Sequence, residues 1–473
     1  TEAYYRKIPL LILSADRPKN LINKGHGQTI MQDFVFGNHT KNSASFEDID
    51  FEKLKTLQYP EVCEKHLSAL FLEPKGPVHF NIHLDEPLYE SLEQNLDFSI
   101  KPVTESIPEL FEANPEFIQK INGKNTIVLC GQNADCDGLN RELVHFNQNT
   151  NVVVLNENTS GINDSSFINC IDRTLNGISE NEHKDFVPDV LITIGDAIVS
   201  KKIKAFFIQN PPGFHIAINH SSIGIDLFHC LGEHIKTDPS TVFNALNAHN
   251  LQRNTTNFEG KWKTIDFIAK DRLPYFFKTE KTTTDIQVFD ALNQNIEENS
   301  LIHLANSSVV RYMQLFDPIK SVRYLGNRGT SGIDGSMSTA VGSATALPNQ
   351  KHLFITGDVS FIYDSNSMWI KPFPENLKII VIDNQGGGIF RIIDGASTSN
   401  QLETFFEAKH STDVKKIAEG YGLSVIEINH LKSFGSTIQK FIQDSTHQML
   451  LIKTDRVENP LALRRLFKYL KND

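Results

Sequence analysis

Three loops in the last third of the sequence carry residue types that suit a phosphate group and a metal ion. They are GNRGTSGIDG at residues 326–335, GDVS at 357–360 and DNQGGGIF at 383–390. Glycine lets backbone amides approach a phosphate closely, and the N-terminus of a following helix adds a favourable dipole. Asp358 and the side-chain oxygen of Asn384 are hard ligands of the kind that Mg²⁺ takes together with a loop carbonyl and phosphate oxygens. A Gly-Asp or an Asp-Asn pair after a strand is typical of a turn when it occurs alone. The loops that contain Asp358 and Asn384 together predict a diphosphate and magnesium site.

Short apolar runs along the chain predict the strands that would position these loops. The clearest are PLLILSA (9–15), VHFNIHL (78–84), NTIVLCG (125–131), NVVVLNE (151–157), DVLITIG (189–195), HLFITGD (352–358) and LKIIVID (377–383). Continuous β-branched runs of this length are typical of strands covered on both faces of a parallel sheet. Helical patterns lie between the runs, so we predict an α/β fold with right-handed crossovers. In such sheets ligands bind beyond the carboxyl ends of the strands, which is where the three loops lie.

The length of 473 residues predicts about three domains. Polar, linker-like stretches at 91–115 and 270–287 place the boundaries near residues 95 and 280. We therefore expect three parallel-sheet α/β domains, at 1–95, 96–280 and 281–473. The opening TEAYYRKIPLLILSADRP reads as the end of a helix, a turn and a buried strand. We interpret the first domain as incomplete, with a segment missing before Thr1.

Composition narrows the class of protein. The net charge of −11 disfavours nonspecific binding to nucleic acid or to an anionic membrane, although a local basic pocket for an acidic substrate stays open. No apolar run reaches the length of a membrane span, and no signal peptide is apparent. The five cysteines (Cys63, Cys130, Cys136, Cys170 and Cys230) form no CxxC pair. We interpret them as reduced thiols in a cytoplasmic protein.

The pairing of Gly357-Asp358 with Asn384 resembles the diphosphate and metal signature of thiamine-diphosphate enzymes. The chain resembles more closely one family among them, the 2-succinyl-5-enolpyruvyl-6-hydroxy-3-cyclohexene-1-carboxylate synthases. The stretches that carry this resemblance are EAYYRKIPLLILSADRP, GHGQTIMQ, HFNIHLDEPLY, NSSVVR, GNRGTSGIDGSMSTAVG, GDVSFIYDSN and NQGGGIF. They run from the start of the chain to about residue 390, and NRGTSGIDG is the most specific of them.

The resemblance implies thiamine diphosphate and Mg²⁺ (or Mn²⁺) as cofactors and a transferase reaction of menaquinone biosynthesis. In that reaction 2-oxoglutarate is decarboxylated on the cofactor, and the resulting carbanion adds to isochorismate. The cofactor supplies the carbanion chemistry, while the protein supplies orientation and electrostatics. The resemblance also implies a homodimer or homotetramer with the site between subunits.

Carried over motif by motif, the resemblance assigns the site residues. Because both substrates are anionic, the substrate-binding set is mostly cationic: Arg17, Gln28, Lys201, Lys202, Ser307, Arg311 and Arg328. The cofactor-binding residues are Ser331, Ile333, Gly357, Val359, Ser360, Ile389 and Phe390. The metal ligands are Asp358, Asn384 and the carbonyl of Gly386. Ile333 would hold the cofactor bent, and Ile389 and Phe390 would face the substrate end.

Several features leave other interpretations open. Arg17 could cap a turn, Lys201-Lys202 could be a solvated helix face, and Arg311 could be a surface charge. The basic pair is Lys-Lys where the family usually has Lys-Arg, and the metal loop starts with Asp383 where Asn is more usual. The family's activating glutamate lies upstream of the segment that matches Thr1, so it is assigned to no residue here.

Two alternative functions stay open. One is another thiamine-diphosphate enzyme, such as a 2-oxo acid decarboxylase or an acetolactate-type synthase. The other is a non-catalytic phosphate-binding relative, although GxGxxG and GxxxxGK[ST] are both absent from the sequence. Without the upstream glutamate, we expect a chain that begins at Thr1 to be catalytically inactive.

Overall fold

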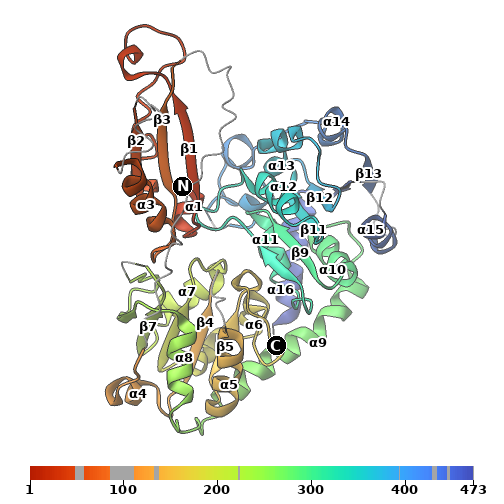
Figure 1. Ribbon diagram of the computed structural model, residues 1–473. Helices are drawn as coiled ribbons and strands as arrows, with labels where there is room; N and C mark the ends of the chain where they lie inside the picture. The colour runs from red at the N-terminus through yellow and green to blue at the C-terminus, as the bar shows by residue number, and fades with distance from the viewer. Residues whose placement is uncertain are drawn as a thin grey trace. The chain divides into compact units, whose positions relative to one another are not determined.

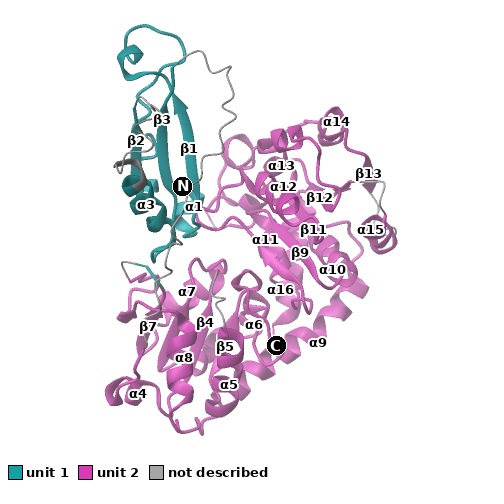
Figure 2. Ribbon diagram, viewed as in Figure 1, with its two compact units in different colours: residues 1–109, 220–222 teal, residues 110–219, 223–473 magenta. Residues whose placement is uncertain are grey.

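The computed structural model contains three parallel sheets (Figure 1). It describes residues 1–47, 58–85, 111–132, 138–221, 224–393, 395–428, 434–444 and 448–471. Contacts divide the chain into two compact units, residues 1–109 with 220–222, and residues 110–219 with 223–473 (Figure 2). The parallel-sheet α/β fold is as predicted. The domain boundaries near residues 95 and 280 stay a prediction, and the first of them lies outside the described residues.

The first unit contains a three-stranded sheet in the order β1-β3-β2. Its strands are β1 (Leu11–Asp16), β2 (Asn42–Phe46) and β3 (Val78–His83), and its helices are α1 (Glu2–Tyr5), η1 (Lys19–Leu21), η2 (Gly37–His39) and α3 (Gln58–Phe71). The expectation that β1 is covered on both faces is wrong within this unit, since Leu13 is 62% exposed. The reason is that β1 is an edge strand, whereas α3 packs on β2 and β3.

The second unit begins with a five-stranded sheet in the order β5-β4-β6-β7-β8. Its strands are β4 (Thr126–Cys130), β5 (Val153–Asn156), β6 (Val190–Ile194), β7 (Phe214–Ile218) and β8 (Leu231–Ile235). Its helices are α4 (Pro115–Ile121), α5 (Leu139–Thr150), η3 (Asn158–Ser160), α6 (Ile171–Leu175), η4 (Glu180–Phe186), α7 (Lys201–Gln209) and α8 (Pro239–Asn247). Alternate residues of β4 enter two different cores, Val128 with Phe146 and Leu129 with Trp262. The sheet is therefore covered on both faces, as its apolar strands predict.

The rest of the second unit is built on a six-stranded sheet in the order β10-β9-β11-β12-β14-β13. Its strands are β9 (Ser300–Leu304), β10 (Arg323–Leu325), β11 (Lys351–Gly357), β12 (Leu377–Asp383), β13 (Val425–Ile428) and β14 (Met449–Lys453). Its helices are α10 (Asp285–Asn295), α11 (Ser308–Met313), α12 (Ser336–Ala346), α13 (Asp358–Tyr363), η5 (Ser365–Trp369), η6 (Gly388–Arg391), η7 (Leu402–Phe406), α14 (Val414–Gly420), α15 (Phe434–Gln443) and α16 (Glu458–Leu470). On β12, Ile380 packs in one core and Val381 in the other. The carboxyl ends of the strands hold the three glycine-containing loops.

The predicted linker at 270–287 is wrong over most of its length. Residues up to Thr279 belong to the long helix α9 (Phe258–Thr279), and α10 starts at Asp285. Trp262, Ala269, Leu273 and Phe276 are buried along α9 at helical spacing, so packing outweighs the polar composition and the internal proline, Pro274.

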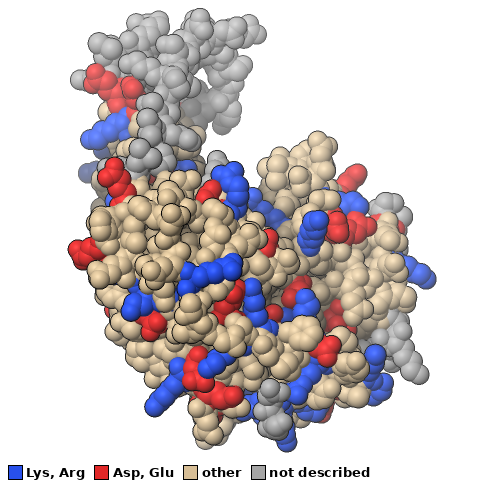
Figure 3. All heavy atoms as spheres, turned by 90° about the horizontal axis from the view of Figure 1, so that it is seen from below, with Lys and Arg blue, Asp and Glu red and all other residues tan. Residues whose placement is uncertain are grey.

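Two further sequence predictions concern the cysteines and the membrane-spanning segments. Cys63, Cys130, Cys170 and Cys230 are free thiols, while Cys136 lies outside the described residues. Across the described part of the chain, no helix combines the length and the apolar character needed to cross a bilayer. On the face drawn in Figure 3, acidic and basic side chains are interspersed.

Candidate active site

The carboxyl ends of β9, β11 and β12 border a cavity of about 480 Å³. Thirteen of the residues assigned from the sequence lie around it: Ser307, Arg311, Arg328, Ser331, Ile333, Gly357, Asp358, Val359, Ser360, Asn384, Gly386, Ile389 and Phe390. They come from the three glycine-containing loops and from α11. The structure thus brings together residues that are spread over more than eighty positions of the chain.

We call the part of the cavity around Asp358 and Asn384 the metal end, because these two residues are the predicted metal ligands. Asp358 follows β11 directly and is only 2% exposed. Its Oδ1 accepts a hydrogen bond from the amide of Val359 at 2.7 Å, and its Oδ2 accepts one from the amide of Gly386 at 3.0 Å. The second bond ties the GDVS loop to the glycine-rich loop, so the carboxylate is held in one orientation. A preoriented carboxylate is suited to bind a divalent cation.

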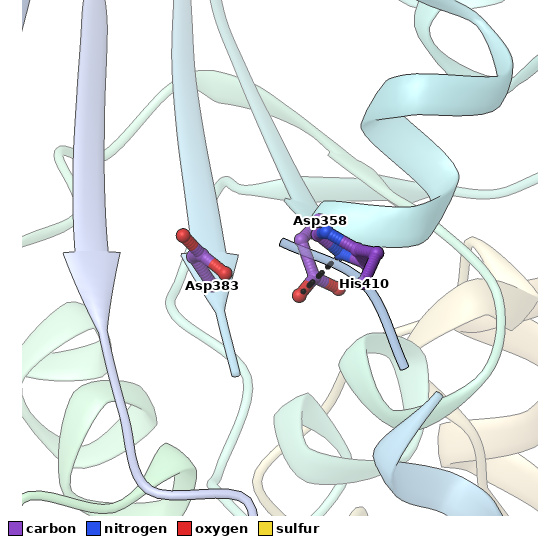
Figure 4. Close-up of side chains that lie close together, drawn as sticks. All are labelled: Asp358, Asp383 and His410. Carbon is purple, nitrogen blue, oxygen red and sulfur yellow. Dashed lines mark ion pairs between the residues drawn. The ribbon is translucent and has the colours of Figure 1, made fainter. Parts of the chain in front are cut away.

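Two further groups lie close to Asp358 (Figure 4). Asp383 stands at the end of the neighbouring strand β12, and His410 Nε2 lies 3.3 Å from Asp358 Oδ2. One ligand atom from each of the three residues falls within 4.8 Å of the others. Burial and the nearby Asp358 carboxylate raise the pKa of Asp383, while the close contact with Asp358 raises the pKa of His410. The carboxylates repel one another, and a cation between them would relieve this repulsion.

Asn384 supplies the observation that fits a metal ion best. Its side chain is 8% exposed, and Oδ1 is buried with no hydrogen-bond partner among the described residues. Its Nδ2 donates to Asp285 Oδ2 at 3.3 Å, which fixes which end of the amide faces the cavity. Asp285 in turn accepts from Thr454 and Asn459, and burial raises its pKa to about 6. A buried acceptor oxygen without a donor is unfavourable, so the site fits a bound cation.

Other side chains that line the cavity are positioned by hydrogen bonds between neighbouring loops. Ser360 Oγ donates to the carbonyl of Ile333 at 2.5 Å, which fixes the loop that places Ile333 in the cavity. Arg328 is buried, and its Nη1 donates to Asn306 Oδ1 at 2.8 Å. Asn306 itself donates to the carbonyls of Asn327 and Gly332, both at 2.6 Å. The NSSVVR and NRGTSGIDG segments therefore support each other across the cavity.

A second cavity of about 530 Å³ adjoins the first. It is lined by Lys201 and Lys202 at the start of α7, and it shares Arg311 and Ile389 with the first cavity. Arg311 is half-buried, its Nη1 donates to the carbonyl of Ser307, and burial lowers its pKa. Four cations, Lys201, Lys202, Arg311 and Arg464, thus lie around one hollow, and the role of the first three in binding substrate stays a prediction.

The start of α7 is held by a buried carboxylate that the sequence did not single out. Glu157 is 1% exposed, and it accepts hydrogen bonds from the amides of Val199 and Ser200 at 2.8–2.9 Å. Burial raises its pKa to about 7. Ser200 Oγ also donates to Asp172, which lines the second cavity. These two acidic residues anchor the helix that presents the lysine pair.

Comparison with known proteins identifies the family. A family model described as "Thiamine pyrophosphate enzyme, C-terminal TPP binding domain" matches residues 307–453. The chain is 35% identical to a 2-succinyl-5-enolpyruvyl-6-hydroxy-3-cyclohexene-1-carboxylate synthase of Flavobacterium johnsoniae, over 99% of this chain and 84% of that protein. The chain belongs to this synthase family.

Other members of the synthase family are similar to this chain over most of its length. The protein of that name from Desulfotalea psychrophila is 34% identical over 89% of this chain and 77% of its own length. The one from Phocaeicola vulgatus is 30% identical over 100% of this chain and 84% of its own length. The resemblance to a thiamine-diphosphate-dependent enzyme with a divalent metal is therefore confirmed, and the matched domain contains the metal end of the cavity.

The assignment of individual residues stays a prediction. Arg17 and Gln28 belong to the first compact unit. Sequence reasoning missed Asp285, Asn306 and His410, all of which lie at the cavity or beside Asp358. Asn306 is the first residue of the NSSVVR motif, so the motif could have pointed to it. Asp285 and His410 lie in segments without a motif, and the fold alone brings them to the site.

Proposed function

We propose that this protein decarboxylates 2-oxoglutarate and joins the remaining four-carbon unit to isochorismate. The product would be 2-succinyl-5-enolpyruvyl-6-hydroxy-3-cyclohexene-1-carboxylate, an intermediate of menaquinone biosynthesis, with release of carbon dioxide. Family membership supports the reaction, and the cationic lining of the paired cavities supports the anionic substrates. Bound thiamine diphosphate would supply the nucleophilic carbon and the electron sink for the decarboxylation.

Asp358, Asn384 and the Gly386 carbonyl would hold Mg²⁺ or Mn²⁺, which in turn binds the diphosphate. Two observations support this assignment: Asn384 Oδ1 has no partner among the residues that the structure describes, and two backbone amides hold the Asp358 carboxylate. Ser331, Gly357, Val359 and Ser360 would contact the cofactor. Ile333 would also contact the cofactor, and the hydrogen bond from Ser360 to its backbone carbonyl holds the loop that carries it.

The substrate carboxylates would bind to Arg311 and to the other cations that line the two cavities. Ser307, Arg311 and Arg328 line the first cavity, and Lys201 and Lys202 line the second. Arg311 Nε is buried and has no hydrogen-bond partner among the described residues, so a carboxylate in the cavity would satisfy it. Arg17 and Gln28 complete the proposed set, and Ile389 and Phe390 form its apolar wall. In this arrangement the protein binds and orients, with little acid–base chemistry of its own.

The observation that carries the proposal is the shared position of Arg311 between the two cavities. It predicts a strong preference for a 2-oxo acid with a distal carboxylate. The test compares kcat/KM for 2-oxoglutarate with that for 2-oxovalerate, which has the same chain length but no second carboxylate. We expect a preference of about tenfold or more, the value of one charge-assisted contact. Equal kcat/KM for the two acids would contradict the proposal.

We further propose that the protein is cytoplasmic and acts as a homodimer or homotetramer. The interspersed surface charges of Figure 3 are compatible with such a protein. Sedimentation velocity of the intact protein distinguishes the two assemblies. A monomer that retains full activity would contradict a site built between subunits.

A further inference from the structure

A buried ion cluster holds residues 402–410, which we call the strap. Glu407 in the strap has a side chain that is 0% exposed. Arg391 donates to both of its carboxylate oxygens, with Nη2 to Oε2 at 2.7 Å, and Arg456 Nη1 donates to Oε2 at 3.0 Å. Arg391 directly follows Ile389 and Phe390, and Arg456 comes from the loop after β14. One carboxylate thus joins three segments that are distant in sequence.

The backbone of the strap lies against the glycine-rich metal loop. The amide of Gly387 donates to the carbonyl of Glu407 at 2.5 Å. A Cβ atom at Gly386 would come within 2.9 Å of the same carbonyl oxygen, so glycine is required for this close approach. Gly386 is the residue whose amide donates to Asp358, and the Asp358 carboxylate also contacts His410 of the strap. The strap therefore contacts the metal end of the cavity twice, through the Glu407 carbonyl and through His410.

The strap also forms part of the wall of the first cavity. Phe406 and Ala408 line the first cavity, and the Phe406 ring lies 5.9 Å from the ring of Phe390. Phe405, the residue before, is 75% exposed. Glu407 is the only buried residue of the strap, so we expect its ion cluster to contribute most to keeping the segment in place.

We propose that Glu407 is a positioning residue, which locks the strap over the cofactor site and so holds the glycine-rich loop where it supports Asp358. The proposal rests on the proposed function only in taking thiamine diphosphate with Mg²⁺ as the ligand. A fully buried carboxylate between two arginines is strongly coupled to its partners, because its loss leaves their charges uncompensated. Ion pairs of exposed residues contribute far less.

The strap itself offers a matched control. Glu403 lies in the same segment and pairs with the same two arginines, at 2.8 Å from Arg391 Nη2 and 3.8 Å from Arg456 Nη2. Its side chain, however, is 59% exposed. Glu403→Gln therefore removes one negative charge from the same cluster without removing the buried link.

The experiment measures two properties of Glu407→Gln, Glu403→Gln and the milder Arg456→Gln in the intact protein. Calorimetric titration gives the Kd for thiamine diphosphate at fixed Mg²⁺, and hydrogen exchange of the cofactor-free protein reports on peptides that cover the strap and residues 384–393. Circular dichroism confirms that each variant is folded at the temperature of titration. Activity is not needed as a readout.

For Glu407→Gln we expect the Kd to rise about 10–100-fold, as is usual when a group that orients a metal ligand is lost. Its strap and glycine-loop peptides should exchange faster. Glu403→Gln should stay within about twofold of the unaltered protein, as for most surface changes, and Arg456→Gln should fall between. If Glu407→Gln does not fold, Arg456→Gln decides the question in the same way.

Two results would overturn the proposal: a folded Glu407→Gln protein with unaltered Kd and exchange, or an equal effect from Glu403→Gln. A lower melting temperature without either change would mean that the cluster serves stability alone, which also overturns it. If the unaltered protein binds no thiamine diphosphate, the proposed function fails, but strap exchange in the cofactor-free variants still decides the role of Glu407.

Discussion

Replacing Arg311 tests the substrate end of the site. Arg311 lines both cavities, and its Nη1 is already engaged with the carbonyl of Ser307. Its Nε, which has no hydrogen-bond partner within the described part of the chain, is available to a substrate carboxylate. One charge-assisted contact contributes about 1.5–3 kcal/mol, so Arg311→Gln should lower kcat/KM roughly tenfold to a hundredfold or more. Arg311→Lys should also be impaired, because an ammonium group cannot form the two parallel contacts of a guanidinium.

The assay determines kcat and KM separately for 2-oxoglutarate and for isochorismate, with thiamine diphosphate and Mg²⁺ saturating. The Kd of the cofactor should not change, because we assign Arg311 to the substrate and not to the cofactor or the metal ion. Arg323→Gln is the matched control, since Arg323 is an exposed arginine of the same sheet, on β10. Wild-type kinetics in Arg311→Gln would refute the reasoning and return Arg311 to the class of ordinary surface charges.

Three further predictions follow from buried polar groups. Asp358→Ala and Asn384→Ala should each weaken Mg²⁺-dependent binding of thiamine diphosphate about 100-fold in calorimetry, and unchanged affinity would exclude either as a ligand. Burial raises the pKa of Glu157 from 4.5 to about 7. The folded state therefore holds the proton more tightly, and its stability falls as pH rises through that range. Between pH 4.5 and 8 this should lower the free energy of unfolding, measured with urea, by roughly 2–3 kcal/mol, and Glu157→Gln should abolish that decrease. The same pH dependence in Glu157→Gln would contradict this prediction. Arg173 is 1% exposed and pairs with Asp266 and Asp317, so Arg173→Met should lower the free energy of unfolding by about 3 kcal/mol, whereas an unchanged urea midpoint would show that the pairs contribute nothing.

The apolar strands were predictable because burial on both faces leaves a continuous signal. The run LKIIVID forms β12, and successive residues of this strand pack alternately in the two cores on either side of the sheet. Strand β2, NSASF, and strand β8, LGEHI, carry no such signal, because both are edge strands in which a single residue is fully buried. Helix α9 shows the opposite case, in which a charged sequence with an internal proline is helical because one face is buried.

The metal end of the site was predictable because Asp358 and Asn384 each follow such a strand within a glycine-containing loop. His410 and Glu407 were not predictable, because they lie in a segment of irregular backbone whose position is set by contacts with Arg391 and Arg456. Glu157 was missed for a similar reason. It ends an apolar run like many other residues, and only the fold places it beneath the first turn of α7.

The most direct test of the account is product analysis of the intact protein, supplied with thiamine diphosphate, Mg²⁺, 2-oxoglutarate and isochorismate. Carbon dioxide release and the mass of the organic product are measured together, with isochorismate omitted in a parallel reaction. The account predicts that carbon dioxide and the succinylated cyclohexene adduct form in equal amounts, and that both depend on isochorismate. Carbon dioxide release without any adduct, or preferential turnover of a 2-oxo acid that lacks the distal carboxylate, would contradict it.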